Sequence, residues 1–313
     1  MAASLSIPQF DRTTGAFTDA TLLESMAVAA IQASSRITAP FGHRGLSLGC
    51  RAASLLSSER DIVIRLNEDA AFRIPFADRY WSRLLNRNYS YEREIEFLLR
   101  SVADMTYTFF DCGANFGYWS VLVTSRPYGH QRAVAVEASP RNAAWLSANA
   151  SLNNNRFVAL NAAIGGQTGG YVRITGHKHE AMSTLALGGR EDGDIEVRSL
   201  DDLALDIDPQ SPTIVKLDIE GAEIEAINGA GRLASGNSLF ICEDHGSDRD
   251  HLVSRYLTDR TPMRVYAFDP SIARFRRLRD ATELDGIKQF SWVGYNVFAT
   301  ASRLWEDRLL SAR

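Results

Sequence analysis

One segment near the middle of the chain places four charged residues around the end of a predicted β-strand. Residues 214–223 read Ile-Val-Lys-Leu-Asp-Ile-Glu-Gly-Ala-Glu. Because side chains alternate along a strand, Lys216 and Asp218 share one face, and Glu220 and Glu223 follow at the carboxyl end. A central parallel strand is normally apolar, and buried charge is costly unless it is paired or used. A structural pair with a carboxylate would account for Lys216, but three converging acids indicate proton transfer or ligand binding.

A second group of candidate residues lies in a turn after another apolar strand. Asp111 ends that strand, and Gly113, Asn115 and Gly117 lead into a helix. Ligands of open α/β sheets bind at such turns, and glycine lets them approach the main chain. A dinucleotide fingerprint needs a third glycine and a turn that can bind phosphate. The carboxylate of Asp111 would repel a phosphate but would attract an ammonium group. The turn therefore favours S-adenosylmethionine as cofactor over NAD, and a plain packing turn remains an equal alternative.

The end of the next strand carries a third acid, Glu137, which lies 26 residues after Asp111. Acids near this offset accept hydrogen bonds from ribose hydroxyls in Rossmann-like sites. A carboxylate would also repel a 2′-phosphate, which argues against NADP. The alternative is a surface glutamate favoured by a helix N-terminus. We assign Ala138 and Ala163 to the predicted cofactor site together with Asp111, Gly113, Asn115, Gly117, Glu137 and Asp218.

A fourth strand ends in Glu243, Asp244 and His245. A histidine, with a side-chain pKa of about 6.5, can act as a general base, although a loop histidine without a function is equally compatible. Carboxylate oxygens can also bind Mg²⁺, and Asp244 could join them. We favour an acid or histidine base over a metal. The predicted catalytic residues are Asp218, Glu220, Glu243 and His245, and Asp218, Glu220 and Glu243 would be the ligands if Mg²⁺ were present.

These positions require a sheet that brings several strand ends to one edge. From residue 106, short apolar runs alternate with helical stretches, which predicts an α/β, Rossmann-like fold with a seven-stranded, mostly parallel sheet and helices on both faces. The last two runs have little helix between them and could pair antiparallel. We expect an inserted hairpin at 171–175 and 195–200. The predicted strands are 107–111, 133–137, 157–161, 214–219, 239–243, 264–268 and 295–299, with helices at about 116–126, 140–150 and 221–230.

The residues before the predicted sheet are less informative. Residues 1–60 form a poorly defined N-terminal extension with one candidate helix at 19–35. Residues 61–76 alternate apolar and polar side chains, which predicts a hairpin, and 90–102 have helical apolar spacing. We expect 61–102 to cover the cofactor cleft, and 103–313 to form the cofactor-binding domain.

Composition narrows the class of partner. The chain has 313 residues, a net charge of −4 and a pI near 5.9, without the basic footprint of a nucleic-acid partner. Three scattered cysteines indicate neither a disulfide framework nor a zinc site, which favours the cytoplasm. No apolar run reaches the ~20 residues of a membrane span, so we expect no membrane partner.

Taken together, the motifs resemble the FkbM family of S-adenosylmethionine-dependent methyltransferases. The resemblance rests on Asp111–Tyr118 (DCGANFGY), Glu137 and Lys216–Glu223 (KLDIEGAE), with support from 199–203 (SLDDL) and 295–299 (YNVFA). It implies a Class I methyltransferase fold and an enzyme that usually methylates a hydroxyl, often of a sugar or natural product. The acids Asp218, Glu220 and Glu223 match the acidic signature of this family.

Two other classes of protein remain as alternatives. A nicotinamide-dependent oxidoreductase would keep the Rossmann-like strands and Glu137, and a non-catalytic cofactor-binding protein would keep the site without turnover. Neither the acceptor molecule nor the oligomeric state is evident from the residues.

Overall fold

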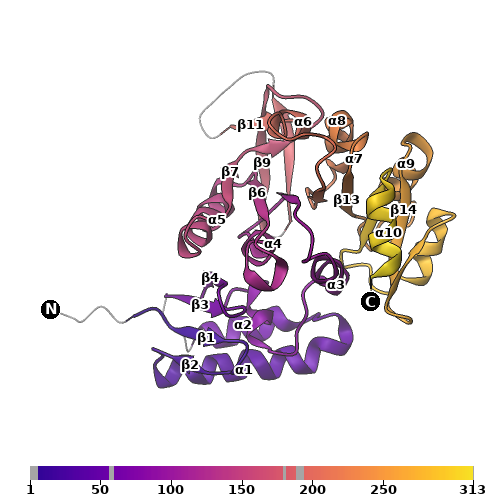
Figure 1. The fold of residues 1–313 in the computed structure, drawn as a ribbon. Helices are drawn as coiled ribbons and strands as arrows, with labels where there is room; N and C mark the ends of the chain where they lie inside the picture. Colours follow the sequence, from indigo (N-terminus) through magenta and orange to yellow (C-terminus); the bar gives the residue numbers. More distant parts are fainter. Residues whose placement is uncertain (1–5, 56–59, 179–180, 188–193, 313) are drawn as a thin grey trace. The chain divides into compact units, whose positions relative to one another are not determined.

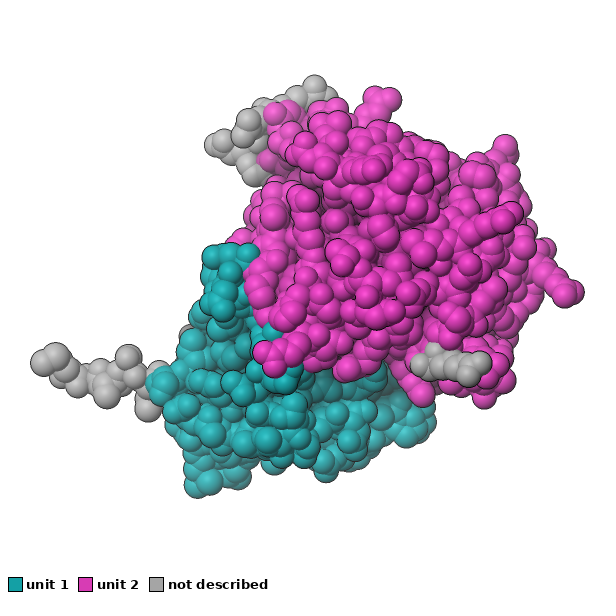
Figure 2. Space-filling view, in the orientation of Figure 1, with its two compact units in different colours: residues 1–91, 148–155 teal, residues 92–147, 156–313 magenta. Residues whose placement is uncertain are grey.

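The chain folds into two compact units (Figure 2). The computed structural model describes residues 6–55, 60–178, 181–187 and 194–312. The smaller unit contains residues 1–91 and 148–155, and the larger contains 92–147 and 156–313. No helix among the described residues is long and apolar enough to cross a bilayer.

An eight-stranded sheet organises the larger unit (Figure 1). Its order is β15-β14-β16-β13-β12-β5-β6-β7, and the pairs from β13 to β7 are parallel. The predicted fold class is confirmed, and β14 and β16 pair antiparallel as expected. The eighth strand, β15, extends the predicted seven at one edge. The bounds are β5 Thr108–Cys112, β6 Arg132–Glu137, β7 Val158–Asn161, β12 Thr213–Leu217, β13 Ser238–Glu243, β14 Arg264–Asp269, β15 Arg274–Arg277 and β16 Asn296–Thr300.

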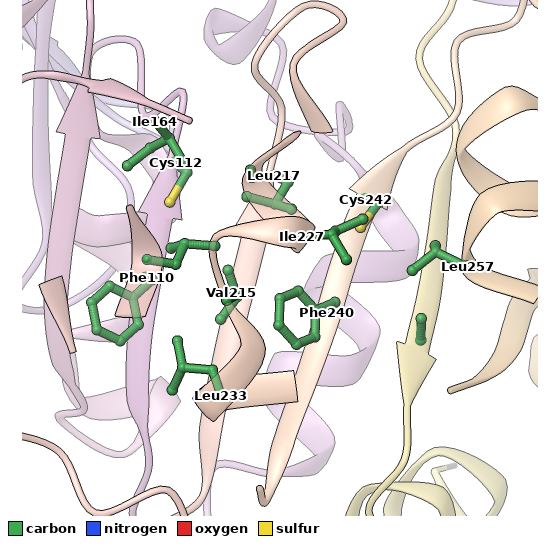
Figure 3. Close-up of a cluster of buried hydrophobic side chains, with 14 of the residues drawn as sticks. Phe110, Cys112, Ile164, Val215, Leu217, Ile227, Leu233, Phe240, Cys242 and Leu257 are labelled. Atoms are coloured by element: carbon green, nitrogen blue, oxygen red, sulfur yellow. The ribbon is translucent and has the colours of Figure 1, made fainter. Parts of the chain in front are cut away.

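Alternating residues of these strands bury one face of the sheet in a large apolar cluster (Figure 3). Phe110, Val215 and Phe240 lie on neighbouring strands and pack with Ile227 and Leu233. Full burial of such side chains contributes about 1.5–3 kcal/mol each. The helices on this face are α6 Leu200–Leu203, α7 Glu223–Asn228, α8 Gly231–Ala234 and α9 Leu252–Arg260.

The other face of the sheet packs against α3 (Arg93–Ser101), α4 (Tyr118–Val123) and α10 (Arg303–Ser311). Phe97 of α3 contacts Phe268, and Trp305 of α10 contacts Tyr107. Helices therefore cover both faces, as predicted. Asp111 and Lys216, which are direct partners in the β5–β12 register, point toward this second face.

A separate sheet in the larger unit has the order β10-β9-β11-β8. The predicted pairing of 171–175 with 195–200 is confirmed, because β9 and β11 are antiparallel. Strand β10, which pairs with the other edge of β9, was not among the predicted strands. The bounds are β8 Ala163–Ile164, β9 Tyr171–Lys178, β10 Ala181–Leu187 and β11 Ile195–Arg198.

The described part of the smaller unit contains a sheet of order β2-β1-β3-β4 and the α-helices α1 and α2. The predicted hairpin is confirmed as the antiparallel pair β3–β4. Helix α1 begins with a capping box in which Thr21 and Glu24 satisfy each other's main-chain N–H groups. The bounds are β1 Gln9–Asp11, β2 Phe17–Thr18, α1 Leu22–Thr38, α2 Leu46–Ser54, β3 Asp61–Arg65 and β4 Ala71–Pro75.

Two asparagines complete the edge of β4. They lie in the C-terminal part of helix α5 (Pro140–Leu152) and just after it. The amide of Asn149 accepts from the N–H of Arg73 at 2.7 Å and donates to its carbonyl at 3.1 Å. The amide of Asn153 makes the same pair of bonds with Ala71, at 3.0 and 2.7 Å. Both amides thus take the place of a neighbouring strand.

Candidate active site

The ends of β5 and β12 meet where the order of the parallel strands reverses, the usual ligand position in such sheets. The N–H of Asp218 donates to the carbonyl of Cys112 at 3.1 Å. Gly113 has φ +77°, and a Cβ atom there would lie 1.8 Å from the carbonyl oxygen of Asp218. Only glycine therefore allows the two strand ends to approach this closely.

The turn after β5 has no main-chain N–H left without an acceptor. Gly113 and Ala114 both donate to the carbonyl of Val136, and Gly117 donates to the carbonyl of Ala114. Asn115 donates to Glu137, and Phe116 donates to the side chain of Asn115. A pyrophosphate-binding turn needs such N–H groups for the ligand. Because its N–H groups already have acceptors within the protein, this turn differs from the pyrophosphate-binding turn of a dinucleotide site.

Glu137 links the turn to the end of β6. Its carboxylate accepts from the N–H groups of Asn115 and Ser139, each at 2.8 Å. Burial raises the pKa of Glu137, although these hydrogen bonds oppose that effect. The carboxylate is thus fixed between two turns at the ends of β5 and β6.

A row of buried and partly buried charges runs from β5 to β12. Asp111 is 1% exposed and accepts from the N–H and hydroxyl of Ser120, which ties β5 to α4. Lys216, 3% exposed, donates to Asp218 at 2.9 Å. Burial opposes ionisation of Lys216, yet the carboxylates of Asp218, Glu92 and Asp111 hold its pKa well above the ordinary value. Burial would likewise raise the pKa of Asp218, but Lys216 lowers it.

Glu92, which the sequence analysis missed, belongs to this row. It precedes α3 with φ +44°, a conformation unusual for a non-glycine residue. Its carboxylate accepts from Trp119 Nε1 at 2.5 Å and from Asn296 Nδ2 at 3.1 Å. Burial raises the pKa of Glu92 to about 7, and Asp218 adds to that rise while Lys216 opposes it. The only signal in the sequence was that an acid stands just before an amphipathic helix.

Asn296 connects Glu92 with a neighbouring acid. Its amide also donates to Glu94 Oε1 at 2.8 Å, and it lies opposite Glu243 in the β13–β16 register. Burial raises the pKa of Glu94. Among the described residues, the buried Oδ1 of Asn296 has no hydrogen-bond donor.

The structure brings together three of the predicted catalytic acids. One oxygen from each of Asp218, Glu220 and Glu243 lies within 4.8 Å of the others. Glu220 is exposed and has φ +54°. Burial and the adjacent Asp218 raise the pKa of Glu243 to about 10, and the two side chains share a hydrogen bond. At neutral pH Glu243 is therefore protonated, and its proton forms the hydrogen bond to Asp218.

Asp244 and His245, which follow β13, have surroundings that differ from those of Glu243. His245 is exposed, and its Nδ1 accepts from the N–H of Ser247 at 3.2 Å. A neutral ring in this position carries its proton on Nε2. Asp244 does not join the acidic trio as the sequence suggested, because it is buried against Lys288 and Ser254.

Three other predicted positions, Ala138, Ala163 and Glu223, make structural contacts. Ala163 is buried in β8 with Val172 and Ile195, and Ala138 packs against the same cluster. Glu223 accepts from the N–H groups of Ile219 and Gly221, and so closes the turn after β12.

The comparisons with known proteins identify the domain. Residues 111–260 match the sequence model of the methyltransferase FkbM domain. This segment is therefore a methyltransferase domain of the FkbM family, as the motifs predicted. No curated protein matches the chain.

Solved structures give more distant likenesses. Methyltransferase FkbM from Methylobacillus flagellatus KT is 17% identical, with a TM-score of 0.39. That match covers 62% of this chain and 44% of the other, so this chain corresponds to less than half of that relative. Precorrin-6y C5,15-methyltransferase from Geobacter metallireducens GS-15 is 14% identical, with a TM-score of 0.35 and coverage of 66% and 86%.

Proposed function

We propose that this chain is an S-adenosylmethionine-dependent methyltransferase that methylates a hydroxyl group of a small molecule, such as a sugar or natural product. The observation that carries the proposal is the turn at 113–117, whose N–H groups are all occupied and whose neighbours are carboxylates. That arrangement disfavours pyrophosphate and favours a cofactor with a positive end.

The residues present fit such a cofactor. Lys216 is surrounded by the carboxylates of Asp111, Asp218 and Glu92, so the row carries excess negative charge for a sulfonium and an ammonium group to balance. In this proposal Glu137 accepts hydrogen bonds from the ribose hydroxyls. Gly113, Asn115 and Gly117 shape the turn beside it, with Asp111 behind them, and Ala138 and Ala163 remain predicted contacts.

When bound, S-adenosylmethionine supplies the electrophilic methyl group. Asp218 then accepts the proton that the acceptor hydroxyl loses, as an ionised carboxylate held by Lys216. A weak base suffices, because the acceptor oxygen becomes strongly acidic as its new bond to carbon forms. Neutral Glu243 donates to Asp218 and keeps it oriented, Glu220 lies beside them, and His245 is the alternative base.

Calorimetric titration with S-adenosylhomocysteine tests cofactor binding, with NAD⁺ as a parallel titrant. We expect binding that weakens about 10- to 100-fold in Glu137→Ala, since hydrogen bonds to a charged group contribute about 1.5–3 kcal/mol. Binding of NAD⁺ alone would contradict the proposal. Methyl transfer to hydroxyl-bearing compounds, followed by mass spectrometry and acid stability of the ether, tests the acceptor class.

A further inference from the structure

The smaller unit exposes an apolar face on its two helices. We call it the α1–α2 face and define it by Leu22, Met26, Ile37, Phe41, Leu48 and Leu55. Each of these side chains is between 52% and 86% exposed. Single exposed apolar residues are ordinary, whereas a concentration within 34 residues of chain indicates a contact surface.

Helical geometry places the α1 members of this face together. Leu22, Met26 and Ile37 lie on one side of α1, with the exposed Ala33 between them. The opposite side buries Ala27 and Ile31 in the core of the unit. Helix α1 is therefore apolar on both its inner and outer sides, a pattern unusual for a helix that faces water.

The second helix packs closely beside the first. A Cβ atom on Gly49 of α2 would lie 2.3 Å from the hydroxyl of Ser34 on α1. Cys50 and Ala53 of α2 are buried, whereas Leu48 and Leu55 are exposed. The α1–α2 face is therefore carried by two helices in contact and the turn between them, which holds Phe41.

From Ser25 to Leu55, arginine is the only charged residue type. Arg36, Arg44 and Arg51 are exposed, and no acidic residue occurs from Ser25 to Leu55. Glu24, just before this stretch, is buried against Arg60. The face is thus cationic in a chain whose net charge is −4.

This charge pattern selects between possible occupants. A two-fold contact between copies would bring the same surface against itself, so that Arg36 and Arg51 would approach the same arginines of the second copy. An anionic bilayer surface instead offers negative headgroups to the arginines and an apolar layer to the leucine, methionine, isoleucine and phenylalanine side chains.

We propose that the α1–α2 face attaches the protein to the surface of an anionic lipid bilayer. The expectation of no membrane partner came from the absence of a spanning segment, and surface attachment needs none. The proposal does not depend on the function of the larger unit.

Vesicle flotation of the full chain tests it, with vesicles of phosphatidylcholine alone or with about one third phosphatidylglycerol, at low and high salt. We expect the protein to float with the anionic vesicles at low salt. Ile37→Ser/Phe41→Ser should weaken this binding at least about tenfold through lost apolar burial. Arg36→Gln/Arg51→Gln should weaken it about thirtyfold, from about 1 kcal/mol per arginine at an anionic surface.

The matched control is Leu205→Ser/Ile272→Ser, which removes two similarly exposed apolar side chains from the larger unit. It should float like the unchanged protein, and thermal unfolding should show that all variants fold. No flotation, or equal flotation with neutral vesicles, would overturn the proposal. So would a dimer in sedimentation experiments that Ile37→Ser/Phe41→Ser dissociates.

Discussion

Lys216 and Asp218, two residues apart at the end of β12, are joined by a hydrogen bond of 2.9 Å between Nζ and Oδ2. Their common face was predictable from strand alternation alone. The pairing keeps both groups charged in a place where burial opposes ionisation. Lys216 also offsets the charges of Asp111 and Glu92, so one cation serves three acids.

Lys216→Met should therefore destabilise the larger unit strongly. Removal of one member of a buried ion pair costs roughly 3–5 kcal/mol, because the remaining charges lose their partner. Urea unfolding at neutral pH measures this loss. The double variant Lys216→Met/Asp218→Asn should recover part of it, and a double loss equal to the sum of the losses in Lys216→Met and Asp218→Asn would show that the pair is not coupled.

Glu92 should make stability depend on pH. Its pKa rises from 4.5 to about 7 on folding, so the folded state binds the proton more tightly. Stability from this group is fully present below pH 4.5 and is lost as pH rises through about 7, by roughly 3 kcal/mol at most. Glu92→Gln, which does not titrate, should flatten the decline between pH 5 and pH 8 in denaturant unfolding. Parallel profiles for both proteins would contradict this account.

Substitutions of Glu243 test whether the three acids hold a shared proton or a metal ion. Because its pKa is about 10, neutral Glu243 and glutamine can both donate to Asp218. Glu243→Gln should keep methyl transfer within about threefold, and Glu243→Ala should lose about tenfold or more with the hydrogen bond. A chelator should leave turnover unchanged. Loss of activity with the chelator, restored by Mg²⁺, would instead favour Asp218, Glu220 and Glu243 as metal ligands.

The stability of the loop after β13 should depend on the ammonium group of Lys288. Its ammonium is buried against Asp244 and donates to the carbonyls of His245 and Asp248, at 3.0 and 2.9 Å. Lys288→Met should cost roughly 3–5 kcal/mol in urea unfolding, since it leaves Asp244 buried without its cation. Arg249→Met removes an exposed cation from the same loop and should cost less than about 1 kcal/mol.

The sequence predicted the elements whose neighbours are near in the chain or whose pattern is regular. Strand β12 was recognisable because apolar residues surround Lys216. Strand β15 was missed because only Phe275 is apolar among its arginines. Glu92 could not be assigned, because its partners Trp119 and Asn296 meet it only after α3 packs on the sheet. Asp244 was placed with the acids beside it in sequence, whereas its partner Lys288 lies 44 residues away.

The hydrogen bonds from the Asn149 and Asn153 amides to β4 affect the tendency of the protein to aggregate. An open strand edge is a template onto which another molecule can add a strand and start aggregation. Asn149 and Asn153 occupy the N–H and carbonyl groups of Arg73 and Ala71 that such a strand would use. Side chains from a helix region thereby protect the protein against edge-to-edge polymerisation.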